Sequence, residues 1–264
     1  MSVRNQRILT AAIAVSLLFL GPKAYGCCTE VEAHEALRSG NFELAAQSGA
    51  QIGTINSRLI AAEALSAKVL LGMAEDAKDS AEEALKLSAS VLRDAPENKE
   101  AQFQYALADG FITRATSPFS AWRKKLPQKT KDKVDALVLS APDDGRAHAL
   151  LGAWHMGILR KTGETNGAKW FGAEAQTGKA AYERALALRP DDIIITSNYA
   201  LSLAELDFDA NEKRARDMLV SVLTASPNDA VEREVQSRMR DVLTLWEDED
   251  ARSKRIERFL DGDG

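Results

Sequence analysis

The residue types most able to carry out chemistry are few in this chain of 264 residues, which contains three histidines and two cysteines. His148 and His155 are seven residues apart, so on one helix they share a face but lie about 10 Å apart along its axis, too far for one zinc ion. The sequence has no HExxH, GxSxG, Walker-type loop or GxGxxG before a strand. A Ser-His-Asp set could still assemble from distant segments, but no local motif indicates one. We therefore expect no catalytic residue, no cofactor, no metal site and no enzymatic activity.

The two cysteines, Cys27 and Cys28, are adjacent, so they cannot link distant parts of the fold. Cys27 is a candidate for lipidation, because bacterial lipoproteins are cut immediately before a cysteine that then carries lipid. The run Ala24-Tyr25-Gly26 departs from the usual pattern, since Tyr25 stands where a small residue is typical. The alternative is a pair of unmodified thiols close to a new amino terminus.

The first 26 residues have the order of a secretory signal peptide. Arg4 and Arg7 precede an apolar run of 13 residues, 8–20, and small residues follow it. A helix of that length spans about 20 Å, less than the roughly 30 Å of a bilayer's hydrocarbon layer, which favours a cleaved signal over a permanent anchor. We expect residues 1–26 to be removed and residues 27–264 to act in the periplasm or elsewhere in the cell envelope.

A basic and aromatic stretch, 118–133, is the first candidate binding surface. It has six Lys and Arg residues against one acid, in a chain whose net charge is −5. Trp122, Arg123, Lys124 and Lys125 could contact a protein groove or an anionic lipid headgroup layer. The alternative is that Phe119 and Trp122 pack on a neighbouring helix while the lysines lie in a solvated loop.

Three further aromatic residues form a second candidate, because aromatic side chains are enriched at interface hot spots. Trp154 lies on a predicted helix, and Trp170 and Phe171 lie in a glycine-flanked segment, 160–172, that could fold as a loop over a groove. Core packing of these aromatic side chains is the alternative.

The composition indicates which elements must position these residues. Hydrophobic residues make up 45% of the chain and charged residues 28%, which is typical of a globular protein. Aromatic residues are only 6%, and Ala, Leu, Glu, Lys and Arg dominate, so the chain favours an all-α fold. The net negative charge argues against nucleic acid as a partner, because such binding depends on clustered cations that neutralise phosphates.

Four prolines mark the boundaries between predicted helices. Pro96, Pro142, Pro190 and Pro227 are separated by 46, 48 and 37 residues, and each has Asp or Asn within the next two residues. Proline cannot continue a helix, whereas Asp and Asn cap the next one, so each site predicts a stop followed by a start.

The segments between these prolines resemble the tetratricopeptide repeat family, in which two antiparallel helices follow a pattern of Leu-Gly, spaced small and aromatic residues, and a closing Pro. The matching segments are Leu71-Gly72, Leu151-Gly152 with Ala181–Pro190, Tyr199-Ala200, and Gly40–Ala45 as the turn of a first unit. The resemblance implies an antiparallel helix-hairpin α-solenoid over residues 27–264. Small residues are needed where two helices cross closely.

The repeats are irregular. Extra residues fall in 160–172 and around 117–133, and residues 146–190 also resemble the tetratricopeptide proteins related to regulators of microtubule dynamics. Apolar residues at helical spacing in 230–260 predict a C-terminal capping helix.

These observations favour a scaffold that binds a protein or peptide partner along its groove. The alternative is an accessory protein that holds a small apolar or anionic ligand for a transporter, which requires a deep pocket of roughly 300 to 1,000 Å³. Membrane contact would come through a lipid on Cys27 or through the basic stretch, and the oligomeric state stays open.

Overall fold

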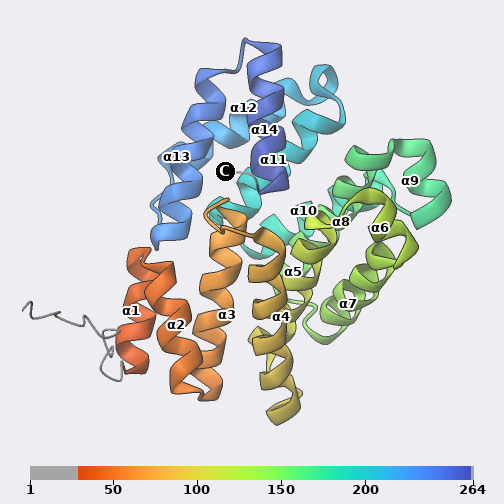
Figure 1. The fold of residues 1–264 in the computed structure, drawn as a ribbon. Coiled ribbons are helices and arrows are strands. Elements are labelled where there is room, and N and C mark those ends of the chain that lie inside the picture. The colour runs from red at the N-terminus through yellow and green to blue at the C-terminus, as the bar shows by residue number, and fades with distance from the viewer. Residues whose placement is uncertain (1–28, 263–264) are drawn as a thin grey trace, which may run out of the picture.

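The computed structural model describes residues 29–262, which fold entirely as helices joined by turns. No strand occurs among these residues, so the predicted all-α class is confirmed (Figure 1). The helices are α1 (Glu30–Ser39), α2 (Phe42–Ile52), α3 (Ile55–Leu70), α4 (Ala77–Asp94), α5 (Lys99–Ala115), α6 (Pro118–Arg123), α7 (Leu126–Ser140), α8 (Gly145–Thr162), α9 (Glu164–Phe171), α10 (Ala175–Leu188), α11 (Ile193–Leu206), α12 (Phe208–Thr224), α13 (Ala230–Thr244) and α14 (Glu249–Asp261). The predicted signal peptide, residues 1–26, and Cys27 lie outside the described residues.

Each of the four prolines lies between two helices, as predicted. The helix after each proline starts with a side-chain cap. The side chain of Asn98 accepts a hydrogen bond from the backbone N–H of Ala101 in α5. The carboxylates of Asp144, Asp192 and Asp229 cap α8, α11 and α13 in the same manner. Such caps satisfy N–H groups that have no partner within the helix, so sequence and local structure agree at all four boundaries.

Six helices form a closed sequence of contacts that we call the inner ring. α1 packs on α3, α3 on α5, α5 on α8, α8 on α11, α11 on α13, and α13 on α1. The last contact joins the two ends of the chain: Arg38 Nη2 donates to the backbone oxygen of Asn228 at 3.5 Å, and Arg233 Nη2 donates to that of Arg38 at 3.4 Å. Between consecutive members of the ring lie further helices: α2 packs on α3, α4 on α5, α10 on α8 and α12 on α11 (Figure 1).

The crossing of α8 and α10 depends on a glycine. A Cβ added to Gly152 would lie 2.5 Å from Cδ2 of Tyr182, so only a hydrogen atom fits there. The Tyr182 ring in turn stacks on Tyr199 of α11, with ring centroids 4.8 Å apart, and both side chains are buried. A small residue therefore lies where α8 and α10 cross closely, as the sequence predicts.

The prediction for Leu71 and Gly72 was wrong. These residues do not sit at a helix crossing but follow the end of α3, where Gly72 has a φ of 58° and Leu71 is fully buried. The backbone turns away at this point, and the left-handed φ is the physical reason for glycine there.

Three segments that the sequence assigned to loops or to one helix have a different structure. Residues 164–171 of the predicted insertion form α9, which is flanked by Gly163 and Gly172, both with positive φ. The basic stretch forms α6 and the start of α7, each with a proline in its first turn. The C-terminal tail forms two helices, α13 and α14, with Trp246 buried at their junction.

The end of α14 is fixed inside the concave side of the molecule (Figure 1). Asp261 forms ion pairs with Arg160 and with Lys161 of α8, the latter at 2.7 Å, and Arg114 Nη1 of α5 donates to the backbone oxygen of Leu260 at 3.0 Å. None of the helices in 29–262 is long and apolar enough to cross a bilayer.

Candidate functional site

A cavity of about 620 Å³ lies among five helices of the inner ring, α3, α5, α8, α11 and α13. Further wall residues come from α6 and α7, and single ones from α9 (Phe171), α10 (Tyr182) and α14 (Leu260). Apolar side chains predominate in the wall, including Leu70, Phe103, Leu107 and Ile194. We call this space the inner cavity.

Small residues of α8 keep the inner cavity open. Ala149, Ala153 and Gly157 follow at intervals of four residues, which places them on one face of the helix, and all three line the cavity. A Cβ added to Gly157 would meet no atom within 4 Å. Gly157 therefore differs from Gly152 on the same helix, since it faces open space instead of a packed ring.

A polar network lines one end of the inner cavity. Ser66 Oγ donates to Gln104 Oε1 at 3.0 Å, and Gln104 Nε2 donates to Glu100 Oε1 at 3.1 Å. Glu100 also accepts a hydrogen bond from Arg146 Nη1 at 2.9 Å, and Arg146 pairs with its neighbour Asp144 at 3.0 Å. These bonds hold the polar groups of α3, α5 and α8 in fixed positions at this end.

Glu63 of α3 also lines the cavity beside this network. Its side chain is exposed to the hollow. Desolvation by the surrounding protein and the negative charges of Glu100 and Asp229 raise the pKa of Glu63 to about 7. The positive charge of Arg146 opposes this shift but is the weaker effect. These effects favour the neutral form of the Glu63 carboxyl group.

The other end of the inner cavity reaches α6 and α9. Trp122 and Phe171 line it there, with Arg160 and Lys161 nearby on α8. The Trp122 side chain lines the cavity and is 60% exposed, so it lies at the rim of an opening there. Along α8, the polar network at Arg146 and this opening are roughly 20 Å apart.

The structure brings the two predicted surfaces together at this opening. Gln128 Nε2 of α7 donates to the backbone oxygen of Trp170 at 3.5 Å, which links the basic stretch to α9. Phe119, Trp122 and Trp170 are all exposed, with the Phe119 and Trp122 rings 6.4 Å apart. We call this surface the aromatic–cationic edge, composed of Phe119, Trp122, Arg123, Lys124, Lys125 and Trp170.

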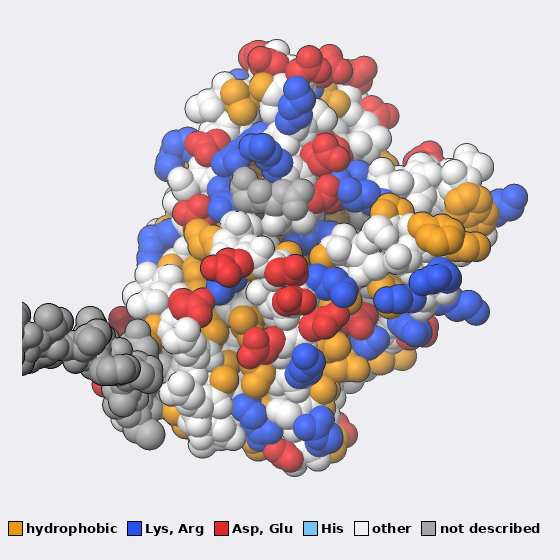
Figure 2. Space-filling view, viewed as in Figure 1, with side chains coloured by type: hydrophobic (Ala, Val, Ile, Leu, Met, Phe, Trp, Pro, Cys, Tyr) orange, Lys and Arg blue, Asp and Glu red, His pale blue; other side chains and the backbone are white. Residues whose placement is uncertain are grey.

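Figure 2 shows hydrophobic side chains next to a group of Lys and Arg side chains over the region of α6, α7 and α9. All three cations of the edge are exposed. Within the described part of the chain, Arg123, Lys124 and Lys125 take part in no ion pair, whereas Lys131 and Lys133 further along pair with Asp135 and Asp109. The charge of the edge is therefore not compensated locally.

Trp154 is positioned differently from the other predicted aromatic residues. Its side chain is 7% exposed, and its Nε1 donates to the backbone oxygen of Pro127 at 2.9 Å. It packs edge-on against His155, with ring centroids 5.0 Å apart. Trp154 thus belongs to the wall of the inner cavity and to the core, and the outer surface does not include it.

The histidines of α8 have structural partners. His155 is buried, and burial together with the charge of Lys131 lowers its pKa, so that its Nδ1 accepts a hydrogen bond from the backbone N–H of Glu174 at 3.1 Å. His148 Nε2 lies 2.8 Å from the backbone oxygen of Pro142. Across residues 29–262, no group of three His, Cys, Asp or Glu side chains is arranged to hold a metal ion.

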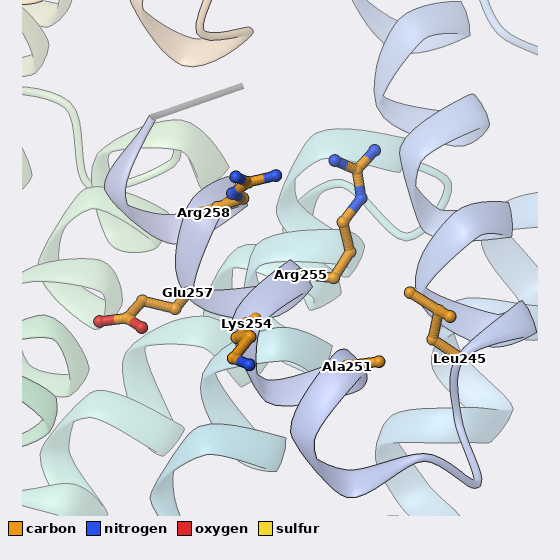
Figure 3. A pocket seen from close by; sticks show the side chains of 6 residues that line it. All are labelled: Leu245, Ala251, Lys254, Arg255, Glu257 and Arg258. Atoms are coloured by element: carbon orange, nitrogen blue, oxygen red, sulfur yellow. The ribbon is translucent and has the colours of Figure 1, made fainter.

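A second hollow of about 500 Å³ lies along α14 (Figure 3). Leu245 and Ala251 line it together with charged side chains of α14, namely Lys254, Arg255, Glu257 and Arg258. In Figure 3 these charged groups spread away from one another, and Arg255 is already paired with Asp241 at 2.8 Å. This hollow lacks a convergent set of groups, so we do not assign it as the site.

Sequence reasoning missed the lining of the inner cavity. The spacing of Ala149, Ala153 and Gly157 was visible, but small residues at intervals of four equally predict close helix packing.

The sequence of the chain matches no model of a known protein family and no curated protein.

Proposed function

We propose that this protein is a non-enzymatic binding protein of the cell envelope and that the inner cavity holds a small, mostly apolar ligand. The observation that carries the proposal is a cavity of about 620 Å³ kept open by small residues of α8. This volume lies within the range of small-molecule sites, and a mostly apolar wall with a few fixed polar groups is typical of them. Of the two functions expected from the sequence, the cavity favours the ligand-holding accessory protein.

The proposal includes the architecture. We infer that the chain is a degenerate tetratricopeptide-type α-solenoid of antiparallel helix hairpins. Support comes from the four capped proline boundaries, from the close approach of Gly152 to Tyr182, and from the alternation of inner and outer helices. In such an array, the inner helices supply the binding surface.

The polar network gives the ligand an orientation. An apolar body would pack against Leu70, Phe103 and Leu107, while a polar group would reach Gln104 or Arg146 at the far end. Since these groups are held by hydrogen bonds to their neighbours, they are positioned before a ligand arrives.

A second candidate function is the binding of a protein or peptide partner. It is supported by Phe119, Trp122 and Trp170, because exposed aromatic side chains near cations are typical of interface hot spots. This binding would use the outer aromatic–cationic edge and would not depend on the inner cavity.

The experiment is a titration of the full chain with N-phenyl-1-naphthylamine, a neutral apolar probe whose fluorescence rises in apolar surroundings. Gly157→Phe projects a large side chain into the inner cavity, and we expect at least a tenfold loss of affinity. Gly157→Ala, which fills almost no volume, is the matched control and should bind as the wild type does.

Equal probe affinity of the wild type and Gly157→Phe would refute the proposal, provided that both unfold cooperatively. Ala153→Phe blocks the cavity from a neighbouring position and replaces Gly157→Phe if that variant fails to fold.

A further inference from the structure

The aromatic–cationic edge exposes large apolar side chains that the fold does not use. Phe119, Trp122 and Trp170 are 68%, 60% and 56% exposed, whereas the other two tryptophans, Trp154 and Trp246, are 7% and 1% exposed. Exposed aromatic side chains that gather in one place mark a contact surface. Figure 1 places α6 and α9, which carry them, at the outer side of the molecule.

The charges of the edge specify the chemistry of the contact. Arg123, Lys124 and Lys125 are consecutive and exposed, and within 29–262 no ion pair involves them or the exposed Lys129 and Lys169. The protein as a whole carries a net charge of −5, so this region opposes the overall sign. A partner rich in negative charge complements it.

We propose that the aromatic–cationic edge docks onto the surface of a bilayer that contains anionic phospholipids. Trp and Phe rings suit the boundary between headgroups and acyl chains, and adjacent cations suit the lipid phosphates. The edge projects outward on two separate helices, which fits a flat, deformable surface better than a structured protein groove.

The position of the edge also deepens the proposed function, on which this step rests. Trp122 and Phe171 belong to the open end of the inner cavity, so docking brings that opening against the bilayer. A mostly apolar ligand could then pass between the membrane and the cavity without crossing bulk water.

The test uses the fluorescence of the full chain with vesicles of brominated phosphatidylcholine, with or without 30 mol% phosphatidylglycerol. Bromine quenches tryptophans that reach the acyl boundary, so the signal reports the edge itself and not attachment through another segment. We expect quenching by the anionic vesicles that weakens with added salt. The double variant Trp122→Phe and Trp170→Phe should lose the quenching but still fold.

Charge is tested with the triple variant Arg123→Gln, Lys124→Gln and Lys125→Gln. Each cation near an anionic surface strengthens binding about fivefold, so the triple variant should need on the order of 100-fold more lipid for half-maximal quenching. The matched control changes three exposed cations elsewhere, Lys86→Gln, Arg93→Gln and Arg240→Gln, and should behave as the wild type does.

Absence of quenching, equal quenching of the wild type and the edge triple variant, or equal loss in both triple variants would overturn the proposal. Capture of an acidic protein by the edge without any quenching by vesicles would also overturn it and would assign the edge to a protein partner. Binding of the naphthylamine probe is measured without vesicles, so failure of docking and failure of ligand binding are distinguishable.

Discussion

Two glycines of α8 provide a matched pair for testing the packing of the inner ring. Gly152 and Gly157 lie five residues apart on the same helix, so Gly→Ala brings the same gain in helix propensity at each, about 0.5–1 kcal/mol. Their surroundings differ, since the new Cβ would lie 2.5 Å from the Tyr182 ring at Gly152 and would meet nothing within 4 Å at Gly157.

The expected effects have opposite signs. Gly157→Ala should raise the free energy of unfolding by about 0.5–1 kcal/mol, because no contact opposes the gain. Gly152→Ala forces Tyr182 and its stacking partner Tyr199 to move, and such overpacking costs about 1–3 kcal/mol. After the helix gain is subtracted, we expect a net destabilisation of up to about 2.5 kcal/mol.

Urea and thermal unfolding, followed by far-ultraviolet circular dichroism, measure the change in the free energy of unfolding and in the melting temperature of each variant. For a chain of this size the two variants should differ in melting temperature by about 5–10 °C. The near-ultraviolet signal of the stacked tyrosines should change in Gly152→Ala alone. Equal shifts of the two variants in the same direction would refute the assignment of one glycine to a helix crossing and the other to the cavity wall.

Three further predictions concern the C-terminal helix, the polar end of the cavity and its wall. Asp261→Asn should lower the free energy of unfolding by about 1–3 kcal/mol, because the ion pairs of Asp261 with Arg160 and Lys161 hold the end of α14. It should also speed hydrogen exchange in α14, and unchanged exchange would contradict this prediction. Glu63→Gln should unfold at a higher temperature than the wild type above pH 7, because burial raises the pKa of Glu63 from 4.5 to about 7 and ionisation then costs more in the folded state. This advantage should be absent below pH 4.5 and grow up to about pH 7, and a pH-independent difference would rule out the raised pKa. Trp154→Phe should destabilise by about 1–2 kcal/mol in thermal unfolding through loss of the bond to Pro127, whereas no loss would show that this bond contributes little.

The helix boundaries were predictable from sequence because their causes are local. Proline is disfavoured in a helix interior. Asp144 and Asp192 each cap a helix because their side chains accept a hydrogen bond from a backbone N–H two or three residues later. No distant contact is needed for either effect.

Local sequence patterns did not predict helix ends or short helices that depend on contacts between elements. Leu71-Gly72 has the same letters as Leu151-Gly152, but α3 ends before the first pair and α8 continues through the second. The glycine-flanked segment that contains Trp170 was expected as a loop, yet it forms α9, because tertiary contacts with α8 support a helix too short to be stable alone.

The inner cavity was beyond the reach of sequence reasoning. Its lining comes from helices far apart in the chain, from Glu63 of α3 to Leu260 of α14. The residues of the aromatic–cationic edge were named from sequence, but their junction depends on the contact of Gln128 with Trp170 across 42 residues. Composition identifies such residues without indicating that they meet.

Native mass spectrometry of the protein isolated gently from its own cells tests the central claim most directly. If the inner cavity of about 620 Å³ holds a small ligand, the wild type and Gly157→Ala should carry one bound molecule that dissociates on activation, and Gly157→Phe should carry none. Recovery of the same bound molecule on Gly157→Phe, or a bare chain in every preparation of a folded wild type, would contradict the account.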